Sequence, residues 1–197
     1  RHRKWSEKQD TAVFRGSVTG TGGNRYTNQR LALLHLHDKV NIDALGTSAN
    51  ARYKYCPVEK RIVQNMIDPR LQISKRHYAP LWQQQECYRY AITVDGHSGA
   101  DRLGSLVCGA QVILKVDPPH HALCPDTWVS QRIFAWEHYI PIDKSMDNLM
   151  PMLTWARTNE SSSARILENC ATWSRLERRS VMQWWADITA AMSRLPS

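Results

Sequence analysis

The sequence predicts one α/β domain with a largely parallel sheet in three layers, closed by C-terminal helices. Short apolar runs rich in β-branched and aromatic residues alternate with loops and helical patterns, an order typical of parallel sheets. The chain has 197 residues, 42% hydrophobic and 22% charged, so it can bury one sizeable core. Its apolar runs, such as residues 31–34 and 112–114, are too short to span a membrane.

The first unit of this pattern is a strand, a loop and a helix. Residues 11–15 (TAVFR) form an apolar run that Gly16 closes, a turn rich in glycine and threonine covers residues 20–23, and a helical pattern covers residues 26–37. The same order then recurs along the chain. The further predicted strands are residues 40–45, 88–94, 111–116 and 137–142, and the further helices are residues 98–108 and 145–157.

The last part of the chain is predicted to be helical. Residues 160–175 and 178–194 are expected to form two helices, and we expect their tryptophans to be core or interface anchors rather than a ligand platform. These tryptophans are Trp173, Trp184 and Trp185. The predicted organisation is a basic arm at residues 1–10, the α/β domain at residues 11–158, and C-terminal helices at residues 159–197 packing on it.

The charge balance predicts an anionic partner. The 26 Lys and Arg residues exceed the 18 Asp and Glu residues by eight, and the pI is about 9.4. The N-terminal arm carries the basic residues Arg1, Arg3, Lys4 and Lys8 against Glu7. Because so charged an arm has too few apolar residues to fold alone, we expect its order to need an external partner: an acidic protein, a lipid headgroup or RNA.

The chain end and the cysteines bear on location. The sequence begins at Arg1 rather than Met, as a processed chain or a fragment would, and its five cysteines include no CxxC pair. A reducing or mixed compartment fits this pattern. We expect a mitochondrial location, with the secretory pathway lumen as the alternative.

Two loops are candidates for holding phosphate. The loop at residues 16–23 lies between a strand and a helix, where backbone amides and a helix N-terminus can hold an anion, and Arg15 and Arg30 flank it. It matches neither a Walker motif nor a GxGxxG fingerprint, so a plain flexible turn is the alternative.

The second loop, at residues 94–103, repeats the design, with the small residues around Asp95 and Gly96 and with Arg102 in the first helical turn. An ion pair with Asp101 is the alternative for Arg102. Because both loops end parallel strands, we predict that Ser17, Arg30 and Arg102 converge on one crevice.

Catalytic and metal sites are not predicted. His120, His121, Cys124 and Asp126 are close in sequence, but their spacing matches no common zinc pattern, and an exposed polar loop is the better interpretation. No nucleophile with a base, and no carboxylate pair, can be identified from spacing. We therefore expect no resident metal and no required cofactor.

Several ordered motifs resemble glycosyltransferase family 90, which includes protein O-glucosyltransferases and capsule-associated, xylosyltransferase-like proteins. Phe14-Arg15-Gly16-Ser17 is similar to the family's Phe-Arg-Gly-Ser. Further similar segments are 28–31 (NQRL), 88–103 (YRYAITVDGHSGADRL), 137–142 (EHYIPI), 146–149 (MDNL) and 153–156 (LTWA). The resemblance covers about residues 12 to 172.

The resemblance implies a Rossmann-like domain that forms the C-terminal half of a GT-B fold and binds a nucleoside-diphosphate sugar such as a UDP-sugar. It places Ser17, Arg30 and Arg102 at the donor's diphosphate, with Arg15 beside them. In the family, the acceptor half and the catalytic carboxylate precede Phe-Arg-Gly-Ser, whereas here only thirteen residues precede Phe14. The segment at 118–124 (PPHHALC) also departs from the family's acidic and aromatic pattern.

Two functional interpretations follow. In the first, which the sequence favours, the chain is a non-catalytic structural or accessory subunit, held by other protein subunits of a larger assembly. In the second, it is the donor-binding half of an active nucleotide-sugar-dependent glycosyltransferase that transfers glucose or xylose to protein or polysaccharide. Fold alone does not decide between them.

Overall fold

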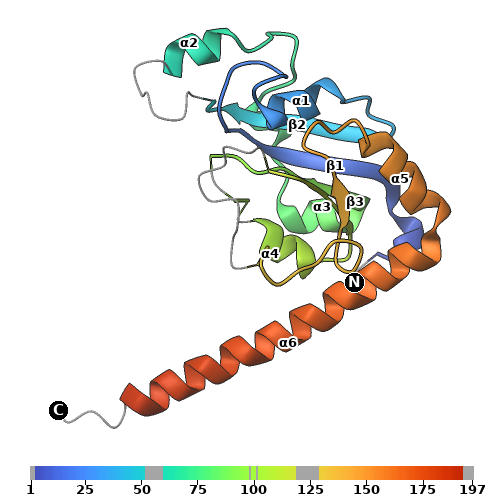
Figure 1. Ribbon diagram of the computed structural model, residues 1–197, viewed down its shortest axis with the longest axis vertical. Helices are drawn as coiled ribbons and strands as arrows, with labels where there is room; N and C mark the ends of the chain where they lie inside the picture. Colours follow the sequence, from blue (N-terminus) through green and yellow to red (C-terminus); the bar gives the residue numbers. More distant parts are fainter. Residues whose placement is uncertain (1–2, 52–59, 98, 101, 119–128, 193–197) are drawn as a thin grey trace.

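A computed structural model describes residues 3–51, 60–97, 99–100, 102–118 and 129–192, and it contains one five-stranded sheet (Figure 1). The strand order is β2-β1-β3-β4-β5, and all four neighbouring pairs are parallel. The strands are β1 (Gln9–Val18), β2 (Ile42–Ala49), β3 (Tyr88–Thr93), β4 (Val112–Val116) and β5 (Ile140–Ile142). The predicted α/β class and parallel sheet are confirmed.

The helices cover both faces of the sheet, as a parallel sheet requires. They are α1 (Gln29–His35), α2 (Lys60–Asn65), α3 (Leu81–Cys87), α4 (Arg102–Val107), α5 (Leu149–Thr158) and α6 (Glu160–Met192), with 3-10 turns η1 (Trp5–Glu7) and η3 (Lys75–His77). Figure 1 shows α1 and α5 on one side of the sheet and α3 and α4 on the other. None of the helices in these ranges is long and apolar enough to cross a membrane.

The core consists of apolar strand residues packed between these helices. Phe14, Ile113, Leu114 and Ile140 are fully buried, with no exposed surface. Because parallel strands are buried on both faces, their sequences are nearly continuous apolar runs rather than alternating ones, which is why residues 88–94 and 111–116 could be recognised as strands.

The C-terminal segment is one helix of 33 residues, so the prediction of two helices was wrong. The segment 175–178 (RLER) contains neither glycine nor proline, and nothing there ends the hydrogen-bond ladder. The first half of α6 packs on the domain through Ile166, Cys170 and Trp173. The second half extends away from the body of the molecule (Figure 1). Trp173 is thus an anchor as predicted, whereas the side chains of Trp184 and Trp185 lie outside the described part.

Residues 3–10 of the basic arm are ordered by contacts within the chain. Trp5 packs edge-to-face on Tyr90 with ring centroids 5.8 Å apart, and Arg89 donates hydrogen bonds to the carbonyls of Trp5 and Ser6. Lys8 is 6% exposed, and its ammonium group donates to the carbonyls of Gln85 and Ala110, both at 2.6 Å. The order of these residues therefore has an internal cause, so their order by itself does not indicate an external partner.

The strand order places a topological switch point between β1 and β3. The chain leaves β1 toward β2 on one side and leaves β3 toward β4 on the other, so the connections diverge there. In open α/β sheets, ligands bind at the carboxyl ends of the strands at such a point. The two loops in question follow Val18 and Thr93, and they are the two loops predicted to hold phosphate.

Candidate functional site

Arg30 joins the two loops at the switch point. It follows Asn28, which caps α1 by accepting hydrogen bonds from the amides of Arg30 and Leu31. The Arg30 guanidinium donates to the carbonyls of Ser17 (2.7 Å), Val94 (2.9 Å) and Asp95 (3.2 Å). These three bonds use three of its five N–H groups.

Arg102 approaches the same place from α4. Its Nη1 donates to the carbonyl of Arg15 at 2.5 Å. The guanidinium carbons of Arg30 and Arg102 lie 5.9 and 5.3 Å from the centre of the Phe14 ring. A Cβ on Gly16 would stand 2.8 Å from Nη2 of Arg102, so the missing side chain at Gly16 makes room for the guanidinium. The predicted convergence of Arg30 and Arg102 is therefore present.

The two guanidinium groups form a buried positive centre. Burial, together with the charge of Arg102, lowers the pKa of Arg30 to about 10, and Asp95 partly opposes this shift. Burial also lowers the pKa of Arg102. Within the described ranges no ion pair joins either arginine to a carboxylate, whereas Arg15, Arg70, Arg89 and Arg157 each have one. Asp101, the alternative partner of Arg102, lies outside those ranges.

The other predicted residues of this site contribute mainly through their backbone. The Ser17 hydroxyl accepts a hydrogen bond from the Ser48 hydroxyl at 2.7 Å, while the Ser17 carbonyl faces Arg30. The Asp95 carboxylate accepts the amide of Ala100 at 2.8 Å and so shapes the second loop. A Cβ on Gly96 would lie 2.2 Å from Thr19 Oγ1 and 3.1 Å from Arg30 Nη2. Glycine at position 96 thus allows the two loops to touch.

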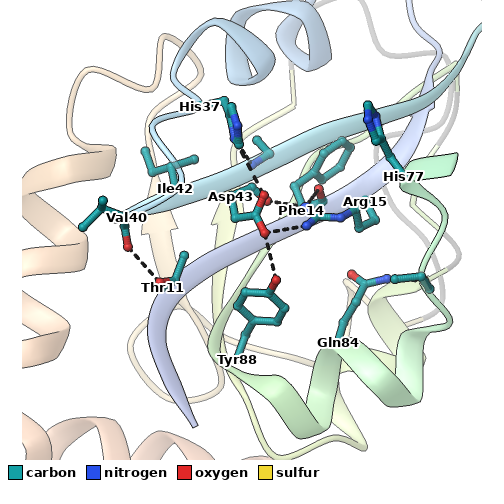
Figure 2. Close-up of polar contacts among 12 residues, drawn as sticks. Thr11, Phe14, Arg15, His37, Val40, Ile42, Asp43, His77, Gln84 and Tyr88 are labelled. Atoms are coloured by element: carbon teal, nitrogen blue, oxygen red, sulfur yellow. Dashed lines mark hydrogen bonds and ion pairs between the residues drawn. The ribbon is translucent and has the colours of Figure 1, made fainter. Parts of the chain in front are cut away.

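Arg15 does not join this centre. Successive side chains of a strand point to opposite faces, so Arg15 leaves β1 on the face opposite Phe14. Figure 2 shows its guanidinium directed at Asp43, to which Nη2 donates at 2.5 Å. The Tyr88 hydroxyl donates to the same carboxylate oxygen at 2.8 Å. The resemblance placed Arg15 beside the diphosphate, but in the structure its side chain is held by Asp43.

Three residues at the site lie in motifs noted from the sequence, but no role was predicted for them. Phe14 carries both guanidinium groups over its ring, and Asn28 ties the first loop to α1 by donating to the carbonyls of Thr19 and Gly22. His97 contacts both neighbouring loops. An Asn before a helical pattern is a recognised cap signal, whereas the contacts of Phe14 and His97 depend on the fold.

Two clefts of about 360 and 390 Å³ lie elsewhere, between α1 and residues 66–72. We do not place the site there, because no residue of the loop after β3 lines either cleft, and because Asp68 and Arg70, which line both, pair with each other. The part of the chain that the structure describes holds no group of three His, Cys, Asp or Glu side chains suited to a metal ion. His120, His121, Cys124 and Asp126 lie outside that part.

Gly16→Ala tests the packing at the centre. The new Cβ would stand 2.8 Å from Arg102 Nη2 and 3.0 Å from Phe14 Cζ. We expect the variant to fold with a loss of about 1 to 2 kcal/mol in the free energy of unfolding, as overpacking usually costs, measured by urea denaturation. Gly104→Ala in α4 is the matched control. Its Cβ would lie 3.2 Å from Cγ2 of Val129, a side-chain atom that needs to shift only slightly, and alanine is the better helix former, so we expect it to be no less stable than the wild type. Equal stability of the two variants would contradict the close packing at Gly16.

Comparisons with known proteins agree with the resemblance. The sequence profile described as glycosyl transferase family 90 matches residues 1–196. Uncharacterized protein 035R of Invertebrate iridescent virus 3 is 32% identical over 184 residues, which cover 90% of this chain and 16% of that protein. Protein O-glucosyltransferase 3 of Rattus norvegicus is 29% identical over 179 residues, covering 91% and 30%, and the Homo sapiens protein of that name is 24% identical over 162 residues, covering 82% and 27%.

These relatives are several times longer than this chain, which spans less than a third of each. The similarity nevertheless extends over most of this chain, and the profile match runs from its first residue almost to its last. On these grounds, the chain belongs to glycosyl transferase family 90.

Proposed function

We propose that this chain binds the diphosphate of a nucleoside-diphosphate sugar, a UDP-sugar in the first instance, as the donor-binding part of a glycosyltransferase. The observation that carries the proposal is the pair of buried guanidinium groups at the switch point between β1 and β3. Burying two like charges is costly unless an opposite charge compensates them. A diphosphate supplies that charge, and its oxygens match the planar donors of arginine.

Family membership supports this enzyme interpretation over the subunit interpretation. The O-glucosyltransferase relatives suggest a protein as the acceptor and glucose as the sugar, which we propose for the whole protein rather than for this chain alone. A general base must lie within hydrogen-bond reach of the acceptor hydroxyl, and we assign no described residue to that role. We therefore expect donor binding without sugar transfer by these 197 residues.

For partners and location, other protein subunits and an anionic partner at the basic arm stay predictions. The predicted mitochondrial location gains no support from the fold or from the relatives. The secretory pathway lumen is accordingly the location that we propose.

Titration calorimetry with UDP and UDP-glucose tests donor binding. We expect saturable binding by the wild type, and a loss of affinity of about tenfold or more in Arg102→Gln, because a hydrogen bond between charged groups contributes roughly 1.5 to 3 kcal/mol. Arg70→Gln is the matched control: Arg70 is exposed and pairs with Asp68 away from Arg30 and Arg102, so its replacement should leave the affinity unchanged. No binding at millimolar UDP, or equal losses in both variants, would refute the proposal.

A further inference from the structure

His97 connects the loops that follow three neighbouring strands. It lies in the loop after β3, its Nδ1 accepts the amide of Gly20 in the loop after β1 at 3.2 Å, and its Nε2 lies 3.1 Å from the carbonyl of Asn50, directly after β2. Asn50 is bonded in turn to β1, because its amide donates to the carbonyl of Val18 at 2.8 Å. One imidazole thus spans the carboxyl ends of β1, β2 and β3.

These contacts require one form of the imidazole. Nδ1 can accept the Gly20 amide only when it carries no proton, so in the neutral ring the proton is on Nε2. Nε2 then donates to the Asn50 carbonyl, which cannot itself donate. Both bonds are satisfied together in this tautomer, and in no other protonation state of the ring.

The segments that His97 connects also hold Arg30. Gly96, which precedes His97, packs against Thr19, which precedes Gly20. Arg30 donates to carbonyls on both segments, those of Ser17 and Asp95. A change in the spacing of the two loops would therefore alter the hydrogen bonds that orient the Arg30 guanidinium.

We propose that His97 is a positioning residue, which in its Nε2–H form fixes the spacing of the strand-end loops and thereby holds Arg30 ready for a diphosphate. The inference rests on the proposed donor binding and adds a residue that sets the affinity of that binding. His97 itself does not contact the diphosphate in this scheme. It acts through the Gly20 amide and the backbone on which Arg30 is oriented.

Three substitutions separate the two hydrogen bonds. In His97→Asn, the side-chain oxygen can replace Nδ1 as acceptor for the Gly20 amide. In His97→Gln, the side-chain amide lies nearer the position of Nε2 and can replace it as the donor to the Asn50 carbonyl. His97→Ala removes both hydrogen bonds. Loss of two net hydrogen bonds predicts about a tenfold weaker affinity for UDP in His97→Ala, with affinity largely restored in His97→Asn. His35→Ala, which removes an exposed histidine of α1, is the matched control and should bind UDP as the wild type does.

A spectroscopic measurement reports the contacts without any ligand. In nitrogen-15 spectra of the wild type, the His97 ring should show the Nε2–H tautomer, and the Gly20 amide should be protected from hydrogen exchange. His97→Ala should remove the protection, and His97→Asn should keep it. An Nδ1–H tautomer in the wild type would overturn the inference even if His97→Ala failed to fold.

The outcomes for the two proposals differ. Failure of the wild type to bind UDP would refute the proposed function. Binding by the wild type with equal affinity in His97→Ala would leave that function standing and refute the role of His97. Equal losses in His97→Ala and His97→Asn would also refute it, because the Gly20 contact would then have no effect.

Discussion

Replacement of Arg30 by methionine is expected to lower the free energy of unfolding by about 2 to 3 kcal/mol and to abolish measurable UDP binding. The side chain supplies three hydrogen bonds to the carbonyls of Ser17, Val94 and Asp95, and each is worth about 1 kcal/mol net. Removing a buried charge beside Arg102 offsets part of this loss. Urea denaturation gives the stability, and calorimetry with UDP gives the affinity.

Arg30→Lys serves as the control for charge. It keeps the positive charge, but a single ammonium group cannot reach three carbonyls on two loops, so we expect it to recover part of the affinity and little of the stability. If Arg30→Met were as stable as the wild type, the three hydrogen bonds would not hold the loops together. If Arg30→Lys bound UDP as tightly as the wild type, the positive charge alone would account for UDP binding, and the geometry of the guanidinium would not matter.

Asp43→Asn is expected to cost about 2 to 3 kcal/mol of unfolding free energy at pH 7, because it breaks a largely buried ion pair and weakens the bond from Tyr88. Burial alone would raise the pKa of Asp43, but the hydrogen bonds from Arg15 and Tyr88 hold it below the ordinary 3.8. The carboxylate therefore contributes stability above about pH 4. This contribution is lost as the pH falls through the lowered pKa, so the difference between wild type and variant should shrink there.

Tyr88→Phe removes one partner of Asp43 and leaves the other two, Arg15 and His37. Burial, together with the neighbouring Asp43 carboxylate, raises the pKa of Tyr88 to about 12. The wild type should therefore lose stability as the pH rises from about 10 toward 12, where the unfolded tyrosine ionises first. Tyr88→Phe should lessen this alkaline loss, while Tyr90, whose pKa is also raised to about 12, keeps part of it. The loss of stability at acid pH should persist in Tyr88→Phe, since Arg15 still pairs with Asp43. Unfolding curves measured from about pH 2 to 11.5 check both the acid and the alkaline loss of stability.

The parallel sheet was predictable because its signals are local. Residues 88–94 and 111–116 are apolar runs bounded by turns, and the order of strands and helices limits the topology. The meeting of Arg30 and Arg102 could also be predicted from local order, because both lie in the first turns of helices that follow strands ending at the same edge of the sheet. Sequence periodicity does not fix the direction of a single side chain, and Arg15 went to Asp43, which lies on the neighbouring strand.

Other features depended on contacts between distant segments. The bonds of Lys8 to the carbonyls of Gln85 and Ala110 join residues far apart in the chain, so the composition of the arm suggested disorder where the fold supplies acceptors. His97 was unpredictable for the same reason. Its role depends on Gly20 and Asn50, which adjacent strands bring together.

The half-anchored helix α6 has a consequence for cooperativity. Forming the first turn of a helix is its unfavourable step, whereas each later residue adds a hydrogen bond at little cost. The turns up to Trp173 are held on the domain, so they act as a permanent nucleus for the residues that follow. Residues 174–192 extend about 28 Å at about 1.5 Å per residue. Loosening the packed turns that carry Ile166, Cys170 and Trp173 would remove the nucleus, and a change in packing at the sheet would thus unwind a helix end far from it.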